Sequence, residues 1–196
     1  LAQRLPAAQA AGYDLLELSV DETPERMARL DWSLGERLDF FRQSREAGIP
    51  VPTMCLSGHR KIPFGSADPE IRKLAAIFME KAITFACDTG IRVIQLAGYD
   101  VYYEPTTHDS RERYYEGMER ALEVAAAHQV MLGLEIMDTP FQNSITKYLQ
   151  LKERLRSPWF KVYPDLGNLT AWGNDLTHEL TIGIDHIVGV HVKETK

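Results

Sequence analysis

The chain has 196 residues, of which 44% are hydrophobic, 26% charged and 9% aromatic, so it can bury a sizeable core and is not a disordered chain. Its formal net charge of -6 disfavours nucleic acid as a partner, because proteins that bind the phosphate backbone carry a basic face. No apolar run approaches the ~20 residues of a membrane-spanning helix and no signal peptide is visible, so we expect no membrane association.

Amphipathic helices and short apolar strands alternate along the whole chain. In order, the pattern predicts helix 1–12, strand 13–20, helix 33–48, extended segment 49–57, helix 68–90, strand 91–98, helix 110–129, strand 130–137, helix 144–157, strand 159–168, helix 175–183 and strand 184–192. Gly12 and Gly48 end the first two helices, as glycine commonly does. Ser33 is the predicted N-cap of the second helix and Asp68 that of the third, with Pro69 in the first turn of the third.

The predicted helix 68–90 has the clearest apolar face in the chain. The residues on this face are Ile71, Leu74, Ile77, Phe78, Ala82 and Phe85. We expect them to pack against the core, because apolar residues at helical spacing form the buried stripe of an amphipathic helix.

Six strands that alternate with helices are typical of βα units and a parallel sheet. Two architectures fit this pattern, a doubly wound open sheet and a (β/α)8 barrel. Polar side chains lie at or just after the carboxyl ends of different strands, namely Glu17, Gln95, Glu135, Asp165 and His191. Because these ends converge on one mouth in a barrel, and because no G-x-G-x-x-G follows any strand, we predict an α/β fold of the TIM-barrel type.

A complete barrel has eight strands and usually ~250 residues. Residues 1–196 are therefore predicted to form a single barrel domain that is truncated at both ends. We expect one strand before Leu1, and a helix, a strand and another helix after Lys196. On this count, segment 184–192 is the seventh strand of the barrel.

Three of the strand ends carry the chemistry of metal ligands. Glu135 in GLEIMD, Asp165 in YPDLGN and His191 in GVHVKET each follow apolar residues that should be buried. A buried carboxylate is costly unless it is paired, protonated or bound to a cation. Two carboxylates and an imidazole suit Mn²⁺, Mg²⁺ or Zn²⁺, with a fourth protein ligand to complete the site. Two of the three also have a structural interpretation when taken alone, His191 as a hydrogen-bonded histidine and Asp165 as the cap of a turn at Gly167, whereas Glu135 has no such local role.

Four further side chains are candidate substrate-binding residues: Glu17, His59, Gln95 and Asn168. Glu17 either orients a substrate hydroxyl or pairs with a neighbouring barrel residue. His59 lies in a basic loop that either closes over an anionic substrate or stays solvated. Gln95 either hydrogen-bonds the substrate or fills the barrel, and Asn168 points to the mouth if the preceding turn is tight.

The segments around these residues resemble a known family over essentially the whole chain. They are ELSVDE, RLDWS, VPTMCLSGHRKIPFGS, IRVIQLAGYDVYYE, LEIMDTPFQNSI, YPDLGNLTAWGND and HIVGVHVKETK. They closely resemble those of the L-ribulose-5-phosphate 3-epimerases, which belong to the xylose-isomerase-like barrels. The resemblance therefore implies the same barrel that the strand ends predict.

This resemblance implies an isomerase of carbohydrate metabolism that epimerises C3 of a pentulose 5-phosphate. The reaction would interconvert L-xylulose 5-phosphate and L-ribulose 5-phosphate in L-ascorbate degradation, through a cis-enediolate. A divalent metal would be held by Glu135, Asp165, His191 and a second glutamate of the eighth strand, with Glu135 also the catalytic acid–base residue. Related ketose 3-epimerases carry a histidine three residues after the metal aspartate; here that position is Asn168, which indicates the sugar-phosphate branch.

The expected partner is a small sugar phosphate, with a homodimer as the candidate assembly. Cys55 and Cys87 sit in apolar segments and are expected to be free thiols, which agrees with a cytoplasmic enzyme. Two other functions stay open, a DNA-repair endonuclease of the same barrel superfamily and a non-catalytic sugar-phosphate-binding barrel. The endonuclease needs more histidine and carboxylate ligands and a basic groove, so Asn168 and the net charge disfavour it.

Overall fold

The computed structural model describes residues 3–194, so both ends of the predicted domain 1–196 and the start of the predicted helix 1–12 lie outside the described residues. The strands are β1 (Glu17–Ser19), β2 (Thr53–Cys55), β3 (Val93–Ala97), β4 (Met131–Glu135) and β5 (Phe160–Tyr163). Neighbouring strands are parallel, and their order in the sheet is their order in the sequence. A doubly wound sheet reverses its strand order at a switch point, so this topology agrees with the predicted barrel instead.

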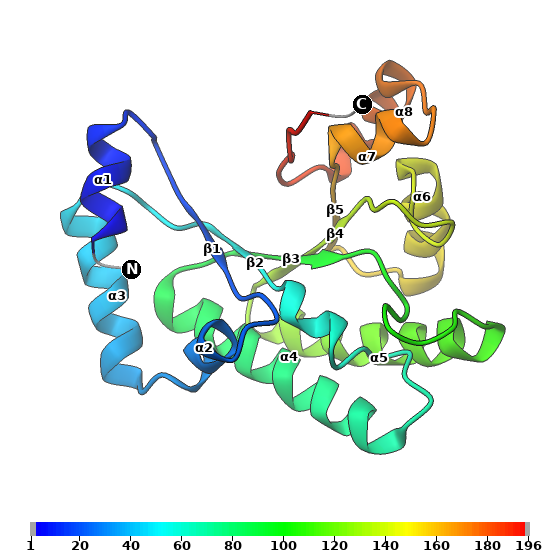
Figure 1. Ribbon diagram of the computed structural model, residues 1–196, viewed down its shortest axis with the longest axis horizontal. Coiled ribbons are helices and arrows are strands. Elements are labelled where there is room, and N and C mark those ends of the chain that lie inside the picture. The colour runs from blue at the N-terminus through cyan, green and yellow to red at the C-terminus, as the bar shows by residue number, and fades with distance from the viewer. Residues whose placement is uncertain (1–2, 195–196) are drawn as a thin grey trace.

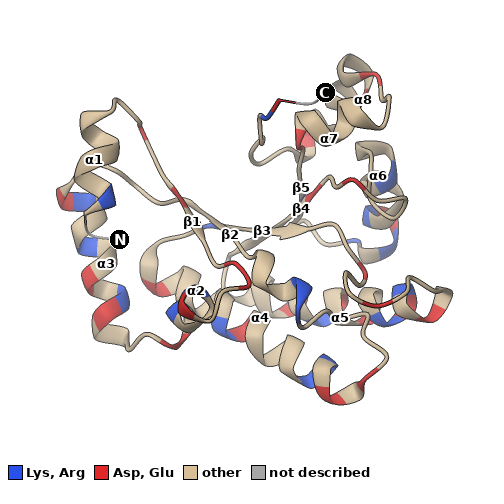
Figure 2. Ribbon diagram, viewed as in Figure 1, with Lys and Arg blue, Asp and Glu red and all other residues tan. Residues whose placement is uncertain are grey.

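The principal helices surround the outer side of the sheet. The helices are α1 (Arg4–Ala10), α2 (Pro24–Met27), α3 (Leu34–Glu46), α4 (Pro69–Thr89), α5 (His108–Ala127), α6 (Ile145–Leu155), α7 (Leu166–Ala171) and α8 (Leu176–Gly183), with 3-10 turns η1 (Ala28–Asp31), η2 (Ser57–Arg60) and η3 (Ile184–His186). Figure 1 shows α3, α4, α5 and α6 arranged around one side of the curved sheet. Lysine and arginine alternate with acidic residues on these helices (Figure 2). Within residues 3–194, none of the helices is both long and apolar enough to cross a membrane.

Side-chain caps confirm two predicted helix starts. Ser33 accepts a hydrogen bond from the Glu36 amide, and the Glu36 carboxylate accepts one from the Ser33 amide at 2.8 Å. At the start of α4, the Asp68 carboxylate accepts a hydrogen bond from the Glu70 amide, also at 2.8 Å. The first amides of a helix have no partner inside the helix, so α3 and α4 begin where the sequence supplies one.

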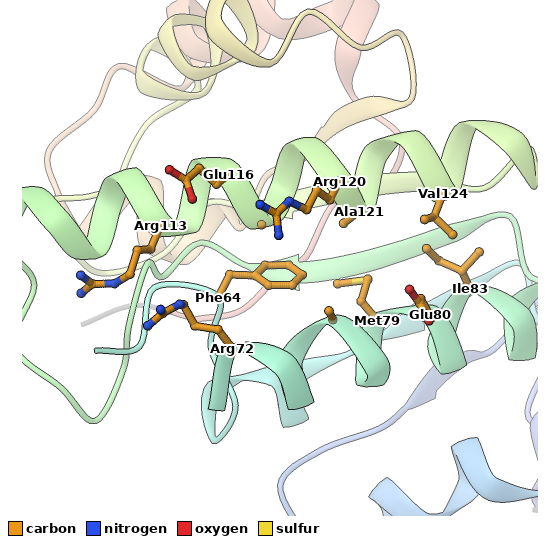
Figure 3. Close-up of a pocket in the computed structure, with 12 residues that line it drawn as sticks. Phe64, Arg72, Met79, Glu80, Ile83, Arg113, Glu116, Arg120, Ala121 and Val124 are labelled. Carbon is orange, nitrogen blue, oxygen red and sulfur yellow. The ribbon is translucent and has the colours of Figure 1, made fainter. Parts of the chain in front are cut away.

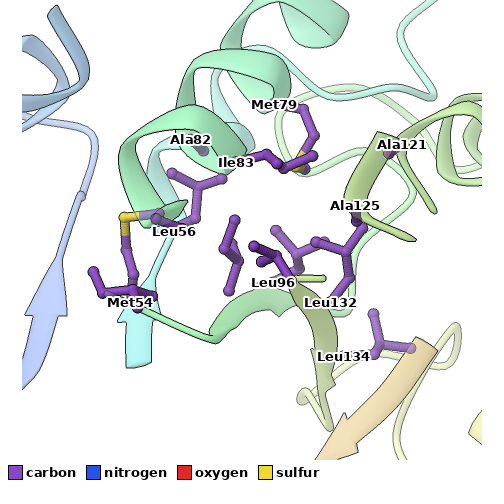
Figure 4. Close-up of a cluster of buried hydrophobic side chains, with 14 of the residues drawn as sticks. Met54, Leu56, Met79, Ala82, Ile83, Leu96, Ala121, Ala125, Leu132 and Leu134 are labelled. Atoms are coloured by element: carbon purple, nitrogen blue, oxygen red, sulfur yellow. The ribbon is translucent and has the colours of Figure 1, made fainter. Parts of the chain in front are cut away.

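The hydrophobic core lies between the sheet and the surrounding helices, and its central part packs against α4 and α5. It contains Met54, Leu56, Leu96, Leu132 and Leu134 from the sheet side, and Met79, Ala82, Ile83, Ala121 and Ala125 from the helices (Figure 4). Successive side chains of a strand point to opposite faces. Cys55, Gln95 and Glu135 alternate with these core residues and therefore face the barrel interior.

The predicted buried face of helix 68–90 needs a correction. Phe78, Ala82 and Phe85 are buried as expected, but Leu74 and Ile77 are each 50% exposed. The buried positions of α4 instead include Ala75, Met79, Ile83 and Ala86. The buried stripe is thus displaced around the helix by about one residue from the predicted one, and Leu74 and Ile77 fall on its outer side.

The predicted strand 184–192 is wrong as a regular strand. Its first residues form η3, and two isolated parallel bridges follow: Val162 with Ile187 and Asp165 with His191. Pro164 lies between the bridged positions on the side of β5, and proline has no N–H to donate to a ladder. The segment nevertheless runs beside β5, because the His191 amide donates to the Pro164 carbonyl at 2.8 Å.

The loop after β2 is anchored in a groove between α4 and α5. This groove has a volume of about 160 Å³ and is lined by Phe64, Met79 and Arg113, among others (Figure 3). The ring of Phe64 lies against Gly117, where a Cβ would approach its Cγ to 2.5 Å. Arg113 Nε also donates to the Gly65 carbonyl at 3.0 Å. These contacts fix the loop that carries η2 and His59.

Candidate metal centre

The three predicted metal ligands meet at the carboxyl ends of the strands. Glu135 is the last residue of β4 and is 8% exposed, and Asp165 follows β5 and is 3% exposed. His191 is bridged to Asp165 and is half-buried. One donor atom from each of the three lies within 4.8 Å of the other two, so the group could hold a metal ion.

A hydrogen-bonded network links this group to β1 and β3. His191 Nδ1 lies 2.9 Å from Glu135 Oε1, and His191 Nε2 lies 3.1 Å from Glu17 Oε1. Gln95 Nε2 donates to Glu135 Oε2 across the interior face of the sheet. The structure therefore brings Glu17 and Gln95, both predicted as substrate contacts, into direct contact with the candidate metal ligands.

Asp165 caps a helix as well as lying in the cluster. Its Oδ1 accepts a hydrogen bond from the Asn168 amide at 2.8 Å and so starts α7. The predicted strand 159–168 consequently ends at Tyr163. The other oxygen, Oδ2, lies 3.1 Å from the ammonium of Lys193. The two interpretations of Asp165 are compatible, because the cap uses one carboxylate oxygen and leaves the other for a cation.

Asn168 is buried and hydrogen-bonded on both ends of its amide. Its Nδ2 donates to the Ile136 carbonyl at 2.9 Å, which ties α7 to the segment after β4. Its Oδ1 accepts from Lys193 Nζ at 2.7 Å. Sequence reasoning missed Lys193, although its spacing from His191 gave a signal. Residues two apart in an extended segment lie on the same side, so Lys193 should reach toward the cluster as His191 does.

The charges of the cluster shift the pKa values of its members. Hydrogen bonds to Glu135 and then to Glu17 raise the pKa of His191 to about 10. Burial raises the pKa of Glu17, but hydrogen bonds from His191 and Thr53 outweigh it and leave this pKa below its usual value. Burial, followed by the charges of Glu17 and Glu135, raises the pKa of the Cys55 thiol to about 11. The interior at the strand ends is thus a negative environment that favours cations.

This donor set fits a divalent cation. Two carboxylates and one imidazole are the oxygen and nitrogen ligands that Mg²⁺, Mn²⁺ and Zn²⁺ accept. Glu135 and Asp165 are buried, and a buried carboxylate requires positive charge nearby. The charged groups that meet them are His191 and Lys193, so the cluster is built to place cations against its carboxylates.

His59 lies beside the strand ends but outside this network. It belongs to η2, is 8% exposed, and its ring is hydrogen-bonded to the backbone of Ala97, which pairs with Glu135 in the sheet. Its Nε2 has no hydrogen-bond partner in the described part of the chain. Burial, and then the charge of Arg60, lower the pKa of His59 to about 4.

The buried, neutral His59 predicts a loss of stability in mild acid. Between pH 6.5 and 4 the unfolded chain binds a proton at this residue that the folded protein does not, so unfolding becomes easier as the pH falls. The lowered pKa of His59 corresponds to a loss of about 3 kcal/mol in the free energy of unfolding by pH 4. The free energy of unfolding of the wild type and of His59→Gln is measured by urea denaturation at several pH values. As the pH falls, it should decrease more in the wild type than in the variant. Equal losses would show that His59 is not held neutral by the fold.

Known proteins resemble this chain over nearly its whole length. A family model described as a xylose isomerase-like TIM barrel matches residues 5–196. The putative L-ribulose-5-phosphate 3-epimerase of Escherichia coli strain K12 is 54% identical over 194 residues, which are 99% of this chain and 68% of that protein. The L-ribulose-5-phosphate 3-epimerase of Escherichia coli O139:H28 is 52% identical over the same shares of the two chains.

Solved structures agree on the fold. A D-psicose 3-epimerase crystallised with D-fructose superimposes with a TM-score of 0.85 at 15% identity, covering 98% of this chain and 67% of that one. An L-ribulose 3-epimerase superimposes with a TM-score of 0.82 at 22% identity, covering 98% and 64%. At these identities the likeness shows the fold alone, which is the predicted barrel. The chain therefore belongs to the xylose isomerase-like TIM barrel family, and its resemblance to the L-ribulose-5-phosphate 3-epimerases is confirmed.

Proposed function

We propose that this protein is an isomerase that epimerises C3 of a pentulose 5-phosphate, interconverting L-ribulose 5-phosphate and L-xylulose 5-phosphate in L-ascorbate catabolism. The observation that carries the proposal is the group of Glu135, Asp165 and His191, whose donor atoms lie within 4.8 Å of one another at the strand ends. Two relatives with 54% and 52% identity bear the name L-ribulose-5-phosphate 3-epimerase, which supports the substrate class.

The chemistry needs a base beside a carbon acid. In a 2-ketose phosphate the C2 carbonyl acidifies the C3 proton, so a carboxylate can remove that proton and leave the electron pair delocalised onto O2 as an enediolate. Return of a proton to the opposite face of C3 gives the epimer. We assign the transfer on one face to Glu135, because its carboxylate is buried in the barrel interior and held by Gln95 and His191.

The same residues would hold the metal. Glu135, Asp165 and His191 are the ligands that this chain supplies for a divalent ion such as Mn²⁺, Mg²⁺ or Zn²⁺. When bound, the ion supplies positive charge that stabilises the negative charge developing on the substrate oxygens. The chain's own residues bind the sugar, exclude water and move the C3 proton.

Gln95 is our first candidate for a direct substrate contact. Its side chain is completely buried on the interior face of β3, and its Nε2 donates to Glu135. Its Oε1 has no hydrogen-bond partner among the residues that the structure describes. A sugar hydroxyl that approaches Glu135 could donate to this oxygen, which would hold the substrate against the base. His59 and Asn168 stay proposed contacts of lower rank, since their described bonds are to the protein itself.

Direct conversion tests this function. Purified full-length protein is incubated with L-ribulose 5-phosphate and Mn²⁺, Mg²⁺ or Zn²⁺ in turn, and L-xylulose 5-phosphate is followed by NMR. We expect the two epimers to reach equilibrium with at least one of the ions. Tight binding of the sugar phosphate without conversion by any ion would favour a binding protein and contradict the proposal.

A further inference from the structure

The imidazole of His191 lies between two glutamates from different strands. Its Nδ1 atom is 2.9 Å from Glu135 in β4, and its Nε2 atom is 3.1 Å from Glu17 in β1. Glu135 belongs to the group that could hold a metal ion, whereas Glu17 does not. Nδ1 is therefore the nitrogen on the side of the candidate ion site, and Nε2 is the nitrogen that contacts Glu17.

Both carboxylate oxygens of Glu17 are engaged by the protein. Oε1 meets His191, and Oε2 accepts a hydrogen bond from the Tyr163 hydroxyl at 3.2 Å. The side chain of Thr53 on the neighbouring strand also hydrogen-bonds this carboxylate. The Glu17 side chain is 23% exposed, so it is largely enclosed by these partners. This arrangement is typical of a group that orients another protein residue rather than a substrate hydroxyl.

Tyr163 contacts both His191 and Glu17. Its ring lies 4.8 Å from the His191 ring between centroids, tilted by 55°. Gly189 gives the Tyr163 ring this position, because a Cβ there would approach Tyr163 Cζ to 2.4 Å. The Tyr163 hydroxyl is the donor to Glu17, because an ionised carboxylate can only accept a hydrogen bond.

We propose that Glu17 is the positioning carboxylate of the metal centre and that Tyr163 holds it in place. Glu17 accepts the Nε2–H of His191 and keeps that proton in place, so that Nδ1 is the nitrogen that gives up its proton and turns a lone pair to a cation when one binds. In metal-binding histidines, the ring nitrogen that does not bind the metal commonly donates its N–H to a carboxylate. This hydrogen bond orients the ring and makes the histidine a more basic ligand. This inference rests on the metal centre of the proposed function, and it assigns Glu17 a role through His191.

The affinity of the full-length protein for Mn²⁺ alone, measured by calorimetry without sugar phosphate, tests this inference. Glu17→Gln should weaken Mn²⁺ binding by roughly 10- to 100-fold, because it removes the charge that supports His191. Tyr163→Phe should weaken it by a smaller factor, and the double variant should lose less than the product of the two effects, since Tyr163 acts through Glu17. Glu46→Gln, which changes an exposed glutamate of α3, is the matched control and should bind as the wild type does.

The Michaelis constant separates a positioning role from a substrate contact. At saturating Mn²⁺, we expect Glu17→Gln to keep a KM for the sugar phosphate close to that of the wild type. Unchanged Mn²⁺ affinity together with a raised KM would overturn the inference. Tyr163→Phe removes a single hydroxyl, so it keeps the test decisive if Glu17→Gln fails to fold. Mn²⁺ binding with this pattern in a protein that does not epimerise pentulose phosphates would refute the proposed function and leave the role of Glu17 standing.

Discussion

Glu135→Gln should lower kcat for pentulose 5-phosphate epimerisation by roughly 10³-fold. Glutamine keeps the size of the side chain but cannot take up a proton from C3, and it is a poorer ligand for a divalent cation. The effect is measured as the initial rate of L-xylulose 5-phosphate formation by the full-length variant at saturating metal and substrate. Glu70→Gln, which changes an exposed glutamate in the first turn of α4, is the matched control and should retain the full rate.

The metal dependence of Glu135→Gln separates its two roles. If raising the Mn²⁺ concentration fills the metal site of the variant but does not restore its turnover, Glu135 acts on the proton as well as on the ion. A Glu135→Gln variant within tenfold of the wild-type kcat at saturating metal would contradict the acid–base role. Circular dichroism of the variant checks that the loss does not come from unfolding.

Removing divalent ions is expected to reduce epimerisation by at least about 10²-fold, and adding Mn²⁺ back should restore it. An ion at the cluster would lower the free energy of the transition state by several kcal/mol, because it stabilises the negative charge that develops on the substrate oxygens. The fold should survive the treatment, because His191 and Lys193 form ion pairs with Glu135 and Asp165. The rate is measured after chelation and gel filtration, with metal content and circular dichroism on the same sample. Full activity in a sample that elemental analysis shows to be metal-free would contradict the metal centre.

The sequence predicts the barrel and the candidate ligands for one physical reason. Apolar runs of strand length force the next polar residue to the carboxyl end of a buried strand, and parallel strands bring these ends together. Glu135, Asp165 and His191 could therefore be selected before any coordinates, although they are 56 residues apart from first to last. Capping chemistry likewise fixes helix starts such as Ser33, because the signal lies within four residues.

What the sequence could not predict depends on contacts across the barrel. Helix α7 is six residues long, too short for a periodic apolar pattern, and its start is set by the Asp165 side chain. The irregular pairing of the last segment follows from Pro164 on the neighbouring strand and not from its own composition. Tyr163 reaches Glu17, 146 residues earlier in the chain, only because the fold brings β1 and β5 toward one interior.

Solvent exchange at C3 tests the proposed chemistry most directly. Full-length protein with Mn²⁺ is incubated with L-ribulose 5-phosphate in D₂O, and the L-xylulose 5-phosphate formed is examined by NMR at each carbon. We expect deuterium at C3 of the product, and loss of this incorporation in Glu135→Gln but not in Glu70→Gln. Conversion to the epimer with the original hydrogen retained at C3 would contradict proton abstraction by this site.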